Sequence, residues 1–419
     1  MNVVVLNTGS ELLLGHVLNT HLAFIAREIF PLGLRVERQI TVPDGPAIGE
    51  ALAAASMNAD IIFVTGGLGP TTDDITREAA AELLKLPLRQ DPVVAAAITE
   101  RLRSRGFPMT DRILRQAEVP EGATVLLNAN GTAPGLYLAG RDEAERMPHL
   151  FLLPGPPREL HPMFQISVLP ILRTIVPQRD GMLCQTFRLA GVGESVVEAA
   201  VGERLLALPD GEIGYCARLG EVDVRVIGPQ STIDSAEALI REAFPLQFFT
   251  KGDEELESAV VGLLRDRSAT MAVAESCTGG YLAHRVTNVP GASAVFIAGF
   301  VTYANEMKTA AVDVPEKLLA EFGAVSAEVA AAMAAGALRK ANSTYALATT
   351  GIAGPDGGSE AKPVGTVYLA FASASGQSKV LRRRFQAERP AFKHLATQVA
   401  LQLLREQILA EGTAEASTA

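Results

Sequence analysis

The chain of 419 residues has no tryptophan, three cysteines and no long apolar run. Cys184, Cys216 and Cys277 are odd in number and far apart, so we expect neither a disulfide framework nor a zinc site. No apolar run approaches the ~20 residues of a transmembrane helix. The opening MNVVVLNTGSELLLG also lacks the basic leader of a signal peptide. These absences predict a cytoplasmic protein with no membrane partner.

Clusters of positive charge are also scarce. The formal net charge is −10, and Lys and Arg are scattered apart from the run Arg382, Arg383 and Arg384. This run is too short for a nucleic-acid footprint, and a solvated strand edge is favoured over a phosphate site. We therefore expect no direct binding of nucleic acid.

The length exceeds what one ordinary hydrophobic core supports, so several domains are expected. In residues 1–176, short β-rich runs alternate with Ala- and Leu-rich helical stretches, which predicts a three-layer α/β domain with a mostly parallel sheet. Residues 177–252 change to a small α+β module of the KH or ferredoxin-like type. The α/β alternation returns in residues 253–411. The small polar residues 412–419 predict a disordered tail.

The middle module does not carry the sequence of an RNA-binding KH domain. Such a domain clamps RNA with a GXXG loop, whereas this chain reads Gly191, Val192, Gly193 and Glu194 and lacks the second glycine at that spacing. A structural or interdomain role is favoured, since topology alone does not imply function.

In the third domain, a buried strand MAVAE runs into the turn SCTGG and then a helix. Ser276 follows the strand, and the amides of Thr278, Gly279 and Gly280 can face an anion or a developing oxyanion. The alternative is that Ser276 only caps the helix, because serine is a favoured N-cap residue.

A serine nucleophile needs a base within reach. His284 and His394 fall within helices, and no GxSxG elbow occurs. The segment GFVTYANEMK instead predicts a strand ending at Tyr303 and a helix carrying Lys308, beside Ser276 at the mouth of the sheet. A desolvated lysine loses its proton readily, so Ser276 as nucleophile, Lys308 as base and Tyr303 as relay form a coherent set. The alternative for Lys308 is a solvated surface lysine.

A third strand ends in the glycine-rich loop TTGIAGPDGGSEAKPVGTV, with Thr350, Gly351 and Gly354 at its start. Such loops offer backbone amides to phosphate or carbonyl oxygens, although this one could be only a long connection. It lacks the GK[ST] ending of a P-loop, which argues against an ATPase.

Four motifs in order, AESCTGG, GFVTYANEMK, GAVSAEVAAAMA and TTGIAGPDGGSEAKPVGTV, resemble the CinA C-terminal domain, the nicotinamide-nucleotide amidase family. The resemblance implies metal-free and cofactor-free hydrolysis of nicotinamide mononucleotide to nicotinic acid mononucleotide and ammonia. It assigns nucleophile, base and nearby tyrosine to Ser276, Lys308 and Tyr303, rather than to the rival nucleophile Cys277. The family's Gly-Asp-Arg turn is replaced by FQAER, whose Arg389 is the candidate phosphate ligand.

The segments SELLLG, GGLGPTTDDITREA, NANGTAPG and LLPGPPREL resemble the molybdopterin-binding-type domain at the N-terminus of CinA proteins. That resemblance implies hydrolysis of ADP-ribose to AMP and ribose 5-phosphate with a divalent metal such as Mg²⁺. Carboxylates are its natural ligands, which makes Asp74, Asp73 and Glu11 the candidates. For the aspartates, capping of the following helix is the alternative.

The expected partners are small molecules, nicotinamide mononucleotide and ADP-ribose, with assembly as a homodimer. Two other interpretations remain open. One is a molybdopterin-binding protein, and the other is a competence or recombination accessory protein without amidase activity.

Overall fold

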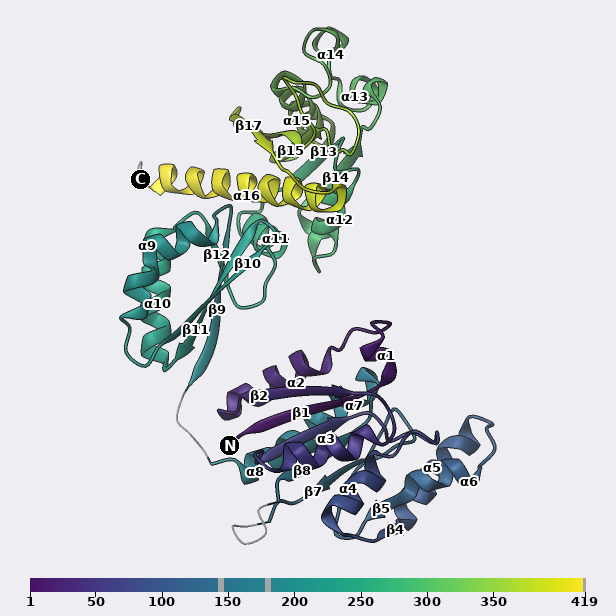
Figure 1. Cartoon of the computed structure of the whole chain (residues 1–419). Helices are drawn as coiled ribbons and strands as arrows, with labels where there is room; N and C mark the ends of the chain where they lie inside the picture. Colours follow the sequence, from purple (N-terminus) through teal and green to yellow (C-terminus); the bar gives the residue numbers. More distant parts are fainter. Residues whose placement is uncertain (142–146, 178–181, 417–419) are drawn as a thin grey trace. The chain divides into compact units, whose positions relative to one another are not determined.

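The structure, a computed structural model, describes residues 1–141, 147–177 and 182–416. The chain forms two compact units, Met1–Met182 and Leu183–Ala419. The predicted boundary at residue 177 therefore adjoins residues 178–181, which lie outside the described residues (Figure 1).

The N-terminal unit is built on a six-stranded sheet with the order β2-β1-β3-β8-β7-β6. The first four strands are parallel, whereas the last two pair antiparallel. Helices α2, α7 and α8 cover one face, and α3 and α4 cover the other, which explains why the central strands are continuously apolar. This confirms the predicted α/β domain with a mostly parallel sheet. The strands are β1 (Val3–Thr8), β2 (Val36–Val42), β3 (Ile61–Thr65), β6 (Thr124–Leu126), β7 (Gly135–Leu138) and β8 (His149–Leu153); the helices are α2 (His21–Ile29), α3 (Ala47–Ser56), α4 (Thr76–Leu84), α7 (Pro157–Met163) and α8 (Leu169–Ile175).

A smaller lobe of this unit joins α5 to a two-stranded ribbon of β4 and β5. Asp91 caps α5 by accepting hydrogen bonds from the amides of Val93 and Val94, at 2.8 and 3.0 Å. The lobe places α5 beside the loop that follows β6, where one wall of a cavity forms. Its elements are β4 (Leu88–Gln90), β5 (Glu118–Pro120), α5 (Pro92–Ser104) and α6 (Asp111–Leu114).

The middle module has the order strand, helix, two strands, helix, strand. Its antiparallel sheet runs β10-β11-β9-β12, the ferredoxin-like arrangement, with α9 and α10 packed on one face. The predicted α+β module is confirmed, and the structure adds the short final strand β12, which the sequence pattern does not reveal. The elements are β9 (Leu183–Ala190), α9 (Glu194–Leu206), β10 (Glu212–Arg218), β11 (Glu221–Gly228), α10 (Gln230–Ala243) and β12 (Phe248–Lys251).

The C-terminal domain has a five-stranded sheet with the order β14-β13-β15-β16-β17. β13 pairs parallel with β14 and β15, whereas β16 and β17 run antiparallel. Helix α15 packs on one face, and α11, α12 and α16 pack on the other. The carboxyl ends of β13, β14 and β15 therefore meet at one edge. The elements are α11 (Leu256–Asp266), β13 (Met271–Glu275), α12 (Tyr281–Thr287), β14 (Phe296–Val301), α13 (Asn305–Val312), α14 (Glu316–Phe322), α15 (Ala327–Ala341), β15 (Tyr345–Gly351), β16 (Thr366–Ser373), β17 (Ser378–Arg384) and α16 (Arg389–Ala416).

Helix α16 extends beyond its predicted end. The sequence predicts a disordered tail from residue 412, but the helix continues to Ala416, and the last three residues of this extension, Ala, Glu and Ala, favour helix. Residues 417–419 lie outside the described residues.

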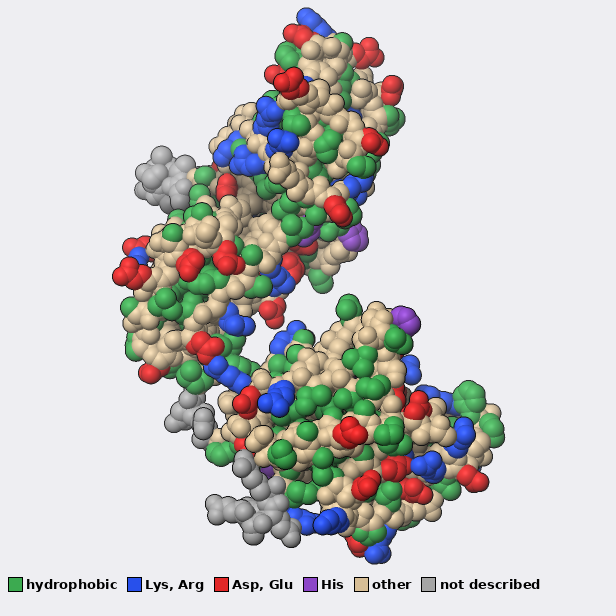
Figure 2. Space-filling model, in the orientation of Figure 1, with side chains coloured by type: hydrophobic (Ala, Val, Ile, Leu, Met, Phe, Trp, Pro, Cys, Tyr) green, Lys and Arg blue, Asp and Glu red, His purple; other side chains and the backbone are tan. Residues whose placement is uncertain are grey.

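Charged side chains of both signs mix on the visible face of each unit (Figure 2). Arg382, Arg383 and Arg384 lie on β17, the edge strand of its sheet. The guanidinium of Arg382 donates to the carbonyl of Ala361 at 2.9 Å and lies 5.9 Å from the centre of the Tyr368 ring. Across the described parts of the chain, no helix has the length and apolarity to cross a membrane.

Candidate active sites

Ser276 lies at the carboxyl end of β13, where the chain leaves the sheet. The amide of Ser276 donates to the carbonyl of Thr349 at 2.9 Å, which extends the pairing with β15 by one residue. Gly279 and Gly280 then take φ values of 58° and 89°, a left-handed conformation that lets the chain turn at once into α12. The Ser276 side chain is partly exposed, and its hydroxyl has no hydrogen-bond partner in residues 1–141, 147–177 and 182–416.

Glu275, directly before Ser276, is the residue that caps α12. Its fully buried carboxylate accepts hydrogen bonds from the amides of Gly280, Leu282 and Ala283 at 3.0, 3.0 and 2.8 Å. A carboxylate satisfies these amides and complements the positive end of the helix. The alternative that Ser276 caps the helix is therefore wrong, which leaves its hydroxyl available for chemistry.

The same contacts show that two of the three backbone amides predicted to bind an anion are already hydrogen-bonded within the protein. The amide of Gly280 is taken by Glu275, and that of Gly279 donates to the carbonyl of Ser276 at 3.1 Å. The Thr278 amide alone of the three has no hydrogen-bond partner within the part of the chain that the structure describes. The Thr278 side chain is buried and shares a 2.6 Å hydrogen bond with the hydroxyl of Thr349, so it fixes the turn to β15.

Lys308 is only 1% exposed, so the alternative of a solvated surface lysine is wrong. Long side chains of a helix point back toward its N-terminus, and Lys308 therefore reaches back over the first turn of α13. Its ammonium nitrogen Nζ lies 3.0 Å from the carbonyl oxygen of Thr302 and 3.3 Å from that of Tyr303. Burial lowers the pKa of Lys308, because the charged form loses its hydration.

Cys277, the rival nucleophile, is 5% exposed and interacts electrostatically with Lys308. Burial raises the pKa of Cys277 to about 12. Since the thiolate is the reactive form of cysteine, a thiol with this pKa is inert at neutral pH. The physical properties of the two neighbours therefore favour Ser276 over Cys277.

Tyr303 meets Arg389 at the rim of this site. The phenol is 60% exposed, and its oxygen lies 2.7 Å from Nη2 of Arg389. Nη1 of the same guanidinium donates to the carbonyl of Gly354 at 3.0 Å. Arg389 thus ties β14, the glycine-rich loop and the start of α16 together, and the Tyr303 hydroxyl contacts this arginine rather than Ser276 or Lys308.

Thr350 and Gly351 shape the edge of the sheet from within. The buried hydroxyl of Thr350 donates to the carbonyl of Ala324 at 2.7 Å. A side chain at Gly351 would lie 2.7 Å from the carbonyl oxygen of Thr366, so only glycine fits beside β16. Gly354 is buried too, and its carbonyl accepts the hydrogen bond from Arg389, so all three loop residues predicted to contact substrate have structural contacts.

The N-terminal unit has a second candidate site. Glu11, Asp73 and Asp74 line one cavity of about 380 Å³, together with the glycines after β3. Asp74 accepts hydrogen bonds from the amide and hydroxyl of Thr71. The N-cap of α4 is Ile75 without a side-chain hydrogen bond, so neither aspartate caps the helix and that alternative is wrong.

These carboxylates do not form a metal centre by themselves. Among the described residues, no three His, Cys, Asp or Glu side chains lie close enough to hold a metal ion. Mg²⁺ is often held by one or two carboxylates together with waters and the phosphates of a substrate. Glu11 and Asp74 line this cavity, and in that mode of binding they would supply the protein ligands.

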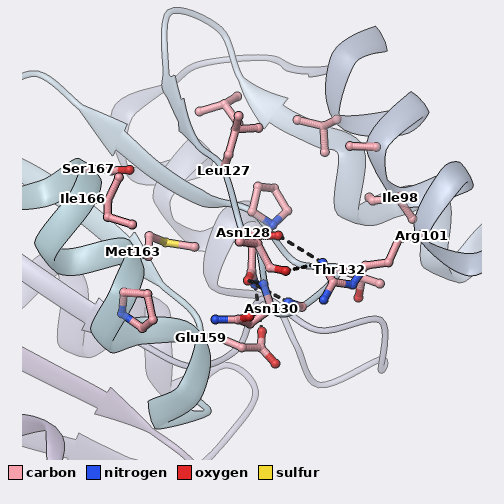
Figure 3. Close-up of a pocket in the computed structure, with 17 residues that line it drawn as sticks. Ile98, Arg101, Leu127, Asn128, Asn130, Thr132, Glu159, Met163, Ile166 and Ser167 are labelled. Carbon is pink, nitrogen blue, oxygen red and sulfur yellow. Dashed lines mark hydrogen bonds between the residues drawn. The ribbon is translucent and has the colours of Figure 1, made fainter.

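A larger cavity of about 590 Å³ adjoins the first and shares Thr132 and Glu159 with it. Figure 3 shows Ile98, Leu127, Met163 and Ile166 on its walls. Most of the polar side chains that line this cavity already form hydrogen bonds within the protein. The carboxylate of Glu159 accepts from Asn128 at 2.8 Å, Arg101 donates to the carbonyl of Ala129 at 2.8 Å, and Asn130 donates to that of Arg158 at 2.9 Å.

Family models match the N-terminal unit, the middle module and the C-terminal domain separately. Residues 253–408 match the CinA C-terminal domain, residues 4–174 match the probable molybdopterin binding domain, and residues 184–244 match the damage-inducible protein CinA KH domain. A CinA-like protein from Akkermansia muciniphila is 43% identical over 401 residues, which cover 96% of each chain. The chain belongs to the CinA family. A putative competence-damage inducible protein from Moorella thermoacetica is also 43% identical, over 96% of this CinA protein and 98% of the relative.

Sequence patterns predict the residues that gather at the edge of the C-terminal sheet, but they do not predict the role of Glu275. The one sign of it is its position, since an acidic residue at the end of a strand just before a helix can accept hydrogen bonds from the first amides of that helix. Its complete burial between strand and helix depends on the tight turn at Gly279 and Gly280.

Proposed function

We propose that the C-terminal domain hydrolyses the carboxamide of nicotinamide mononucleotide to the carboxylate and ammonia, with Ser276 as nucleophile and Lys308 as base. The contacts of Lys308 carry the proposal. A neutral amine has two N–H bonds and one lone pair, and the carbonyls of Thr302 and Tyr303 account for two donors. The lone pair then remains available to accept a proton.

In the first half-reaction, the Ser276 oxygen bonds to the amide carbon while its proton moves to Lys308. The negative charge on the carbonyl oxygen is stabilised by the amide of Thr278. Collapse of this intermediate breaks the carbon–nitrogen bond, and Lys308 returns the proton to the leaving nitrogen. Ammonia departs and leaves an ester on Ser276.

In the second half-reaction, water takes the place of ammonia. Lys308 accepts a proton from the water as it attacks the ester carbon, and then returns the proton to the Ser276 oxygen as the bond breaks. The products are nicotinic acid mononucleotide and free enzyme. Tyr303, held by Arg389, borders the entrance and completes the site from the side of β14.

The test is ammonia release from nicotinamide mononucleotide with EDTA present, which silences any metal site. Ser276→Ala and Lys308→Met should each abolish turnover while circular dichroism and melting temperature show a folded protein. Ser326→Ala, which removes the N-cap of α15 instead, is the matched control and should stay active. Well-folded wild-type protein that releases no ammonia refutes the proposal.

A second activity, hydrolysis of ADP-ribose to AMP and ribose 5-phosphate, is favoured by one observation in the N-terminal unit. Three candidate metal carboxylates and the glycines after β3 line the same cavity. Asp74 and Glu11 would hold Mg²⁺, which would supply positive charge to a diphosphate, and the backbone amides of the glycine loops would face the phosphate oxygens. AMP formation that needs Mg²⁺ and is lost in Asp74→Asn, but persists in Ser276→Ala, supports it.

The match of residues 4–174 to a probable molybdopterin binding domain also favours a bound pterin as an alternative ligand of that cavity. Fluorescence of a pterin released from purified protein on denaturation tests this directly.

The role as a competence accessory protein is tested in a deletion strain complemented with Ser276→Ala. Competence restored by this variant would come from a contribution other than the amidase activity. Sedimentation of the purified chain tests the expected homodimer.

A further inference from the structure

Lys393 lies on α16, one helical turn after Arg389, and borders the Ser276 turn. Its ammonium nitrogen is 3.8 Å from the position that a Cβ atom would take at Gly279. It also lies 5.7 Å from the centre of the Tyr281 ring, at the start of α12. Residues four apart face the same side of a helix, so Arg389 and Lys393 both face the edge of the sheet where Ser276 lies.

The two cations differ in what they already bind. The Arg389 guanidinium is engaged with the carbonyl of Gly354 and the hydroxyl of Tyr303. Lys393 forms no ion pair and no hydrogen bond through its ammonium group among residues 1–141, 147–177 and 182–416. The carboxylate of Glu257, on neighbouring α11, is already paired with Arg285 at 2.6 Å. Within the part of the chain that the structure describes, Lys393 is thus a positive charge without a carboxylate partner, next to the exposed Gly279.

We propose that Lys393 binds the phosphate of the mononucleotide substrate and so selects nucleotides over nucleosides, whereas Arg389 positions Tyr303 and the glycine-rich loop. This rests on the proposed amidase function. In the substrate, the ribose carries the pyridine ring with its carboxamide on one side and the phosphate on the other. With the carboxamide at Ser276, an anionic group at the other end needs a cation at the rim of the same site. Gly279, without a side chain, leaves the approach to Lys393 open.

The test compares nicotinamide mononucleotide with nicotinamide riboside, which has the same carboxamide but no phosphate. Lys393→Met should raise KM for the mononucleotide about 10- to 100-fold, as expected for loss of a charge-assisted hydrogen bond. It should leave KM for the riboside and kcat for both substrates within about threefold. Lys393→Arg should retain most of the selectivity, and Lys317→Met, at an exposed position on α14, is the matched control.

Equal losses with both substrates would instead show that Lys393 only stabilises the turn through the Tyr281 ring, and would overturn the proposal. An unchanged KM for the mononucleotide would also overturn it. Calorimetry can measure the binding of both compounds to Ser276→Ala, with and without Lys393→Met, and so separates the phosphate site from the amidase activity. If binding of the mononucleotide depends on Lys393 but the wild-type protein releases no ammonia, the phosphate site is supported and the amidase is refuted. A protein that binds neither compound refutes both.

Discussion

Replacement of Lys308 gives the sharpest test of the catalytic proposal. Lys308→Met keeps the length of the side chain and removes the amine. A general base contributes about 10²- to 10⁴-fold to the rate, so kcat/KM should fall by at least that factor, or about 3–5 kcal/mol of transition-state stabilisation. Lys308→Arg should fail equally, because a guanidinium stays protonated throughout the accessible pH range.

The pH dependence follows from burial, which lowers the pKa of Lys308. The reaction needs the neutral amine, so kcat/KM of the wild type should rise with pH through this lowered pKa and then level off. Between the lowered pKa of the folded protein and the ordinary value near ~10.4 in the unfolded chain, the unfolded state binds more protons. The stability of the wild type should therefore rise with pH in that window.

Two measurements check this: stopped-flow or coupled ammonia assays from pH 5 to 10, and urea unfolding of wild type and Lys308→Met over the same range. In Lys308→Met, the carbonyls of Thr302 and Tyr303 lose a donor, at a cost of about 1 kcal/mol each, while the cost of burying an amine disappears. The variant should stay folded. A Lys308→Arg protein with wild-type activity, or a flat pH profile for the wild type, would refute the assignment of Lys308 as base.

Two further predictions concern the turn itself. Glu275→Ala should lower the free energy of unfolding by about 3 kcal/mol or more, because three amides of α12 lose a charged acceptor. The control, Glu328→Ala in the exposed first turn of α15, should change the free energy of unfolding by less than about 1 kcal/mol. Urea unfolding measures both values, and equal effects would contradict the capping role of Glu275. Cys277→Ala should keep activity within about threefold, because burial keeps the thiol protonated. For the same reason, thiol-alkylating reagents should not modify Cys277 in the native protein. A folded Cys277→Ala protein without activity would instead indicate Cys277 as the nucleophile.

The sequence predicts which residues gather at the C-terminal site because the carboxyl ends of parallel strands share one edge of a sheet. Ser276 after β13 and Tyr303 after β14 follow from that rule, as does the loop after β15. The burial of Lys308 does not follow, since it depends on how α13 folds back over the end of β14. In the same way, the resemblance of the first domain makes Asp73, Asp74 and Glu11 candidate metal ligands, but the hydrogen bonds from Thr71 to Asp74 depend on the local turn.

Helix α16 of the C-terminal domain also contacts the small α+β module that precedes this domain in the chain. Arg389 and Lys393 lie at the site end of this helix, while further along Gln398 accepts a hydrogen bond from Arg285 at 2.7 Å and donates to the buried carboxylate of Glu221 on β11. Nearer its end, the Arg405 guanidinium donates to the carbonyls of Leu246, before β12, and of Phe248, the first residue of β12. These contacts join α16, whose first turn carries Arg389, to the middle module. They agree with an interdomain role, which the absence of the second GXXG glycine favours over recognition of RNA and which stays a prediction.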